Sequence, residues 1–211
     1  MADNARQNIL NRIKQALSNP VPLPFPDAEK QLDNSVFQHP ENSDEIKLFA
    51  ETFEKLQGRF IYCNNESDLE NNLLQLISDR CWSSIYFREP SFKKLLTKIN
   101  IETCQDLSTC DVAITDCEFL IARTGSIMMS SYQESGRTVS VYAPIHICIA
   151  QRKQIVYDIE NAIEQFTLKY KENIPSFITL ASGPSRTADI EKTLVTGVHG
   201  PKEVFCFFID N

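Results

Sequence analysis

The apolar residues nearest the N-terminus recur at helical spacing. Four of them share one stripe of a helix expected over residues 4–18: Ile9, Leu10, Ile13 and Leu17. The run NPVPLPFPD then brings in four prolines, which exclude a helix and favour an extended, polyproline-like segment. Because the polar stretch up to about Ser43 offers little to bury, we predict a helical arm with a Pro-rich tether over residues 1–42 and a folded domain over residues 43–211.

In the second part of the chain, helical periods alternate with strand-length apolar runs. Helices are expected over residues 44–57, 66–79, 91–98 and 156–170, with a helical turn or two in ADIEKTLV (188–195). Strands are expected in RFIYC (59–63), SSIYF (83–87), DVAIT (111–115), EFLIA (118–122), SIMMSS (126–131), TVSVYA (138–143), HICIA (146–150), SFITLA (176–181) and EVFCFFI (203–209). This order predicts an α/β fold with a mostly parallel sheet and an antiparallel portion.

Charge and composition narrow the classes of function. A net charge of −7 with scattered lysines and arginines argues against a nucleic-acid partner, which usually requires a basic patch. The longest apolar runs fall short of the roughly 20 residues of a membrane span, and the N-terminus lacks the apolar centre of a signal peptide. We therefore expect a cytoplasmic protein without a membrane span.

The seven cysteines favour neither disulfides nor a metal site. Their number is odd, and Cys63, Cys148 and Cys206 lie in apolar, strand-like contexts, so we expect mostly reduced and buried thiols. The closest pairs, Cys104/Cys110 and Cys110/Cys117, are spaced too widely for a zinc or iron-sulfur motif. The sequence therefore predicts no metal ligands in this chain.

Three of the six glycines fall in one segment, SGPSRTADIEKTLVTGVHGP (182–201), which directly follows a predicted strand. Ligands of α/β proteins gather where loops leave the carboxyl ends of strands, so we expect a site here. Gly183 allows a close turn, and Ser185, Arg186 and Thr187 would then begin a helix whose free N–H groups bind an anion. The alternative is that one hydroxyl only caps the helix while Arg186 pairs with a nearby carboxylate.

The same segment contains two carboxylates and a histidine. Asp189 and Glu191 would point to opposite sides of a helix, so they do not form an acid and base pair, but either could orient Arg186 or His199. Solvent exposure of both carboxylates is the alternative. His199 lies in a turn between two glycines, which suits proton transfer, although a histidine there can also be a hydrogen-bonded structural group.

A second group of candidates lies between residues 123 and 147. Thr124, Gly125 and Ser126 connect two predicted strands, Arg137 follows a glycine in what reads as a hairpin loop, and His146 begins another strand. The Thr-Gly-Ser backbone could hold a phosphate or carboxylate, but the tripeptide by itself favours an ordinary β-turn and gains weight only together with SGPSRT.

The ordered combination TGS, GR-x-VS-x3-P-x-HI and SGPSRTADIE-x5-GVHGP resembles the LUD (lactate utilization) domain family, most closely its lactate utilization protein C branch, over residues 45–211. The resemblance implies a fold like that of the NagB/RpiA/CoA transferase group. It also implies a part in the oxidation of L-lactate to pyruvate by a multi-subunit system with iron-sulfur partners. The iron-sulfur clusters would belong to those partner subunits, and no flavin or nicotinamide fingerprint appears in this chain.

One position departs from the family pattern: Arg123 stands where many members have the glutamate of A-E-T-G-S/T. We therefore expect binding more than catalysis, with His199 as the proton-transfer group. A small carboxylate or phosphate would be bound by Thr124, Gly125, Ser126, Arg137, His146, Gly183, Ser185, Arg186 and Thr187. The function expected first is an accessory or substrate-binding subunit of a lactate-oxidising complex. The alternatives are a stand-alone enzyme acting on a phosphorylated or nucleotide-like molecule, and a structural or assembly subunit.

Overall fold

The computed structural model describes residues 2–18, 44–101, 103–188 and 194–210. The chain divides into two units, Met1–Pro40 and Glu41–Asn211. In the first unit, helix α1 (Ala2–Leu17) carries the predicted apolar stripe, whose four side chains are all at least 40% exposed. The Pro-rich tether and the predicted boundary after residue 42 lie outside the described residues. Within the described part of the chain, no helix combines the length and the apolar character that crossing a membrane requires.

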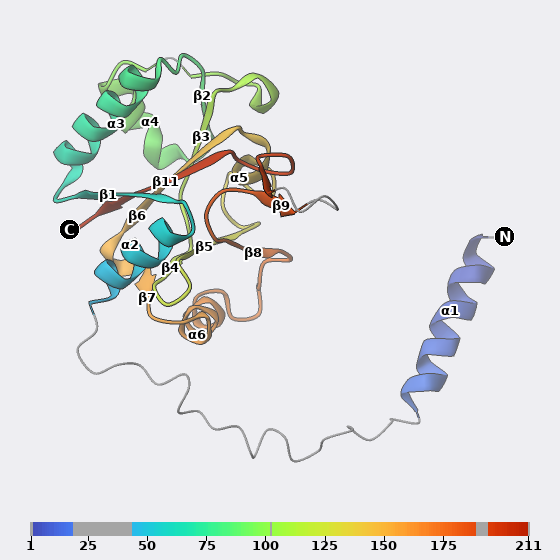
Figure 1. The fold of residues 1–211 in the computed structure, drawn as a ribbon. Helices are drawn as coiled ribbons and strands as arrows, with labels where there is room; N and C mark the ends of the chain where they lie inside the picture. The colour runs from blue at the N-terminus through green and yellow to red at the C-terminus, as the bar shows by residue number, and fades with distance from the viewer. Residues whose placement is uncertain (1, 19–43, 102, 189–193, 211) are drawn as a thin grey trace. The chain divides into compact units, whose positions relative to one another are not determined.

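A five-stranded parallel sheet runs through the second unit (Figure 1) in the order β1-β11-β6-β3-β2. Every neighbouring pair is parallel. The strands are β1 (Arg59–Cys63), β2 (Ile85–Phe87), β3 (Val112–Thr115), β6 (Ile145–Gln151) and β11 (Glu203–Ile209). The long strands β6 and β11 are neighbours inside the sheet because their near-continuous apolar runs can be buried on both faces.

Helices α3 (Glu66–Arg80) and α4 (Pro90–Lys98) cover one face of this sheet. Side chains alternate along a strand, so the odd-numbered residues of β6 pack with these helices in one apolar cluster. The even-numbered Cys148 and Ala150 of β6 face the opposite layer, where they pack with Phe49 and Phe53 of helix α2 (Glu45–Lys55). The parallel sheet is thus buried on both sides.

The opposite layer is a second, four-stranded sheet in the order β7-β4-β5-β8. Its strands are β4 (Phe119–Ile121), β5 (Ser126–Ser130), β7 (Ile155–Val156) and β8 (Ile178–Ala181). Strand β5 is antiparallel to both β4 and β8, whereas β4 and β7 are parallel. Helix α6 (Ile159–Tyr170) packs on this sheet through Phe166 and Tyr170. These arrangements confirm the predicted α/β fold with a mostly parallel sheet and an antiparallel portion.

Two predicted elements are wrong. The run TVSVYA forms the short helix α5 (Val139–Tyr142), because Val139 and Ala143, four residues apart, turn inward while Val141 and Tyr142 are exposed. The predicted helical turn in ADIEKTLV is replaced at both of its described ends by strands β9 (Arg186–Ala188) and β10 (Leu194–Thr196), which pair antiparallel. Their threonines and valine suit a strand better than a short helix. Two 3₁₀ turns, η3 (Leu107–Thr109) and η4 (Arg152–Gln154), complete the described elements.

Candidate functional site

The glycine-rich segment 182–201 follows the carboxyl end of a strand, but this strand is not part of the parallel sheet. It follows β8, which belongs to the second sheet, and Lys202 connects it to the first residue of β11. Its end is tied to the start of β6, because the Lys202 amide donates to the Pro144 carbonyl over 2.7 Å. The segment therefore leaves the carboxyl end of a strand, as predicted, but that strand belongs to the second sheet, and the segment meets the parallel sheet at the amino ends of β6 and β11.

Ser185 holds the two halves of this segment together. Its amide donates to the Pro201 carbonyl over 2.9 Å, and its carbonyl accepts from the Gly197 amide over 3.0 Å. A Cβ on Gly200 would come within 2.9 Å of the Ser185 Cβ, so only glycine allows this contact without displacement. The strand exit and the GVHGP turn are thus one connected unit.

A hollow of about 440 Å³ opens beside this unit. We call it the turn pocket; it is lined by Val141, Tyr142, Pro144, Gly197, Val198, His199, Gly200 and Lys202. Three of its lining residues, His199, Lys202 and Tyr142, have polar side chains and are exposed. Apolar surface comes from Val141 and Val198, which are 42% and 55% exposed. A pocket of this kind can hold a small anion with a short apolar group.

The helix start expected at SGPSRT is absent from this pocket. Arg186 and Thr187 open strand β9, where they pair with Thr196 and Val195 of β10. Backbone groups engaged in a hairpin ladder are not the free N–H groups of a helix terminus, so anion binding by a helix dipole is excluded at these residues. Asp189 and Glu191 lie outside the described residues.

The Thr-Gly-Ser turn lies against helix α2 and Ser182-Gly183. Gly125 and Gly183 have positive φ values of 58° and 79°, and an added Cβ would meet the Phe53 amide nitrogen at 2.8 Å and the Leu56 carbonyl oxygen at 2.4 Å, respectively. The Ser126 hydroxyl bonds that of Ser182 over 2.7 Å. The structure therefore shows the two glycines serving close packing of the end of α2.

Thr124 shares this turn, and its buried hydroxyl has no hydrogen-bond partner among the described residues.

His146 is fully buried between the two sheets, away from the lining of the turn pocket. Its Nε2 lies 2.8 Å from the Thr115 hydroxyl at the end of β3, whereas Nδ1 has no partner within the described residues. Burial lowers the pKa of His146 to about 4, so the ring is neutral at pH 7. This places the residue in the core.

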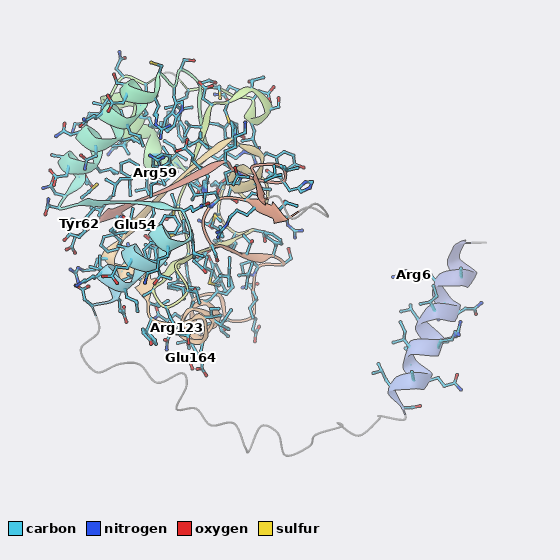
Figure 2. All side chains as sticks on the ribbon, in the orientation of Figure 1. Arg6, Glu54, Arg59, Tyr62, Arg123 and Glu164 are labelled. Atoms are coloured by element: carbon cyan, nitrogen blue, oxygen red, sulfur yellow. The ribbon has the colours of Figure 1, made fainter. Side chains whose placement is uncertain are left out.

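Arg137 and Arg186, which the sequence suggested for anion binding, have different surroundings, as does Arg123. Arg123 forms a 2.7 Å ion pair with Asp158 at the start of α6, near which Figure 2 labels it. The hydrogen bond from Arg123 lowers the pKa of Asp158. Arg137 donates to the Ser176 hydroxyl over 2.6 Å and lies over the Phe177 ring. Arg186 is exposed on β9.

Several polar groups escaped the sequence analysis. Lys202 and Tyr142 line the turn pocket, and the position of Lys202 directly after GVHGP was a usable signal.

Glu118 is a buried carboxylate that the sequence did not single out. It accepts hydrogen bonds from the hydroxyls of Ser130 at 2.7 Å and Tyr170 at 2.8 Å, and it forms an ion pair with Lys169 at 2.7 Å. Burial, followed by the bond to Glu118, raises the pKa of Tyr170. This network ties α6 to the second sheet.

The cysteines are free thiols, and five of the seven are buried: Cys63, Cys110, Cys117, Cys148 and Cys206. Within the described residues, no three His, Cys, Asp or Glu side chains are grouped as metal ligands. The location of any iron-sulfur cluster on partner subunits stays a prediction.

Comparison with known proteins gives consistent results. The family model of the LUD domain matches residues 46–209. An uncharacterised protein of Neisseria meningitidis is 37% identical over 94 residues, which cover 44% of this chain and 40% of that protein. Lactate utilization protein C of Macrococcus caseolyticus is 33% identical over 112 residues, which cover 52% of this chain and 48% of that protein. The matched part thus spans less than half the length of either relative.

Among solved structures, a DUF162 family protein from Deinococcus radiodurans has the same fold. The TM-score is 0.60 at 15% identity, and the match covers 81% of this chain and 99% of that one. The family model accounts for nearly the whole second unit, from α2 to the end of β11. The chain therefore belongs to the LUD domain family.

Proposed function

We propose that this chain acts in lactate utilization as the subunit that binds lactate or pyruvate, beside iron-sulfur partner proteins that accept the electrons. The observation that carries the proposal is the similarity of the chain to lactate utilization protein C. The turn pocket supports it, because this pocket offers a cation, a histidine and a small apolar surface in one place.

The chemistry of lactate suits this pocket. The Lys202 ammonium pairs with the carboxylate, the methyl group lies against Val141 and Val198, and the hydroxyl faces the His199 ring. Oxidation to pyruvate removes two electrons and two protons. His199 would take the hydroxyl proton as a general base, the second proton would leave from C2 to the medium, and the redox group of the partner would supply the acceptor for the two electrons.

A role in assembly without a ligand is the second candidate. It is favoured by the exposed apolar rim of the same pocket, where Tyr142 and Val198 are 73% and 55% exposed. A partner bound here would cover both side chains. In that case Tyr142→Asp abolishes co-purification of the complex, whereas His199→Ala leaves lactate oxidation intact.

The test is growth on lactate after deletion of the gene, with complementation by variants. We expect the deletion strain to grow on glucose but not on lactate, and His199→Ala and Lys202→Ala to restore growth poorly. Lys47→Ala, an exposed lysine on α2, is the matched control and should restore growth fully. Affinity purification followed by iron analysis tests the partners. Unchanged growth of the deletion strain on lactate would refute the proposal.

A further inference from the structure

Strand β8 forms an edge of the second sheet that the described part of the chain leaves uncovered. It pairs with β5 and with no other described strand, and Figure 1 shows it on the outer side of β5. All of its residues keep some exposed surface and Leu180 is 40% exposed, whereas β4 and β5 are buried throughout. Strand β8 therefore offers backbone groups and an apolar side chain to another molecule.

The other edge strands of the two large sheets carry the usual protection against such contacts. Strand β1 includes the charged Arg59, β7 has only two residues, and β2 has three, of which Ile85 is bridged by Thr103. Charges and short length are common ways in which proteins block the pairing of a sheet edge. Around β8, by contrast, residues 173–185 contain no charged side chain. An edge without these features is typical of a strand that pairs with another chain.

The hydrogen-bond pattern identifies the backbone groups that this edge presents. Strand β8 is antiparallel to β5, and just before its first residue the Phe177 carbonyl accepts from the Ser131 amide over 3.0 Å. Hydrogen-bonded pairs alternate along an antiparallel ladder, so Thr179 also bonds β5. The N–H and C=O groups of Ile178 and Leu180 then point away from β5, and no described residue bonds them.

This edge is complementary to itself. When two copies of β8 lie antiparallel across a twofold axis, Ile178 of each copy lies opposite Leu180 of the other, and each such pair exchanges both of its backbone bonds. Thr179 then lies opposite Thr179 of the second copy, in a pair without backbone bonds, where threonine side chains contact favourably. No like charges face each other, because the strand has none. A second copy of this chain thus satisfies every outward backbone group of Ile178 and Leu180.

We propose that the chain forms a homodimer through β8, which joins the four-stranded sheets of two copies into one continuous sheet. The interface is isologous, because the same strand of each copy contacts the other, and the twofold axis passes between the paired Thr179 residues. The proposal is independent of lactate binding, since no residue of β8 lines the turn pocket.

Sedimentation equilibrium of the full chain tests the dimer. At about 100 µM protein we expect twice the mass of the 24.1 kDa chain. Leu180→Lys adds the residue with which proteins often block strand edges, so it should weaken dimerisation at least about tenfold. Leu74→Lys is the matched control and should dimerise like the wild type, because Leu74 is similarly exposed, at 38%, but lies on α3 outside the second sheet. Circular dichroism confirms that each variant is folded.

Disulfide trapping tests the register of the paired strands. The variants carry Cys81→Ser, which removes the exposed native thiol. Thr179→Cys should form a cross-linked dimer with oxidised glutathione, because the Cα atoms of a pair without backbone bonds are about 4.5 Å apart. Leu180→Cys should cross-link much more slowly, since the two copies of this residue are diagonal neighbours about 7–8 Å apart.

A monomer at about 100 µM, or a dimer that Leu180→Lys leaves as stable as that of the wild type, overturns the proposal. Equally fast cross-linking of the two cysteine variants also overturns it. A chain that is monomeric alone and needs Leu180 only to bind an iron-sulfur partner would contradict it as well, because that partner would then supply the added strand.

Discussion

The buried histidine gives the structure a pH dependence that can be calculated. His146 lies fully buried between the two sheets, with the Thr115 hydroxyl as its neighbour at Nε2. Burial lowers its pKa from the ordinary 6.5 to about 4, so the folded protein resists a proton that the unfolded chain accepts. The unfolded state therefore binds more protons between pH 6.5 and pH 4, and the free energy of unfolding must fall as the pH falls through that window.

The size of the effect follows from the two pKa values. A difference of about 2.5 units corresponds to about 3 kcal/mol when the pH falls from well above 6.5 to below 4. Between pH 7 and pH 5, where ordinary carboxylates titrate little, the loss of unfolding free energy from His146 alone is about 2 kcal/mol. This is a large part of the stability of a typical domain.

Urea unfolding at pH 7 and pH 5 measures this loss. The variants His146→Gln and His146→Leu remove the titrating group, so each should lose about 2 kcal/mol less than the wild type between the two pH values. His199→Gln, a change at an exposed histidine, is the matched control and should keep the wild-type pH dependence. If neither His146 variant folds, NMR titration of the His146 ring in the wild type decides instead. Equal losses in wild type and variants, or a ring that titrates near pH 6.5, would refute the reasoning.

Three further predictions concern stability measured by urea unfolding. Glu118→Ala leaves the hydroxyls of its network without an acceptor and should cost about 3 kcal/mol, and a cost below about 1 kcal/mol would show the network to be unimportant. Gly183→Ala should cost about 1–3 kcal/mol more than Gly136→Ala, because both glycines have positive φ but only the former has backbone within 4 Å of the new Cβ; equal costs would contradict this. Arg123→Glu, which restores the common family residue, faces Asp158 with a like charge and should cost about 1 kcal/mol at low salt and less at high salt, whereas a stabilised variant would argue against the ion pair.

The sequence predicted most of the sheet because burial on both faces leaves a strong pattern. EVFCFFI and HICIA are continuous apolar runs, and they became the adjoining interior strands β11 and β6. Local propensity failed where tertiary contacts decide. TVSVYA is β-branched and aromatic but forms α5, because Val139 packs with Ala113 while its neighbours face solvent.

The site was predicted in part for a similar reason. The link between Ser185 and the GVHGP turn could be read from clustered glycines, since close backbone approach needs them. The edge of the parallel sheet at which segment 182–201 lies could not be read from the sequence, because it depends on β8 joining the second sheet. The burial of His146 could not be read from the sequence either, because its side chain is covered only when the second sheet stacks on the face of β6 that carries it.

Lactate binding in the turn pocket is the central claim, and an NMR titration of the full chain with L-lactate and pyruvate tests it most directly. The account predicts saturable shifts in the amides of residues 197–202, with binding weakened about tenfold or more by Lys202→Ala and unaffected by Lys47→Ala. Shifts confined to other residues, or equal affinity in the Lys202→Ala variant, would contradict it.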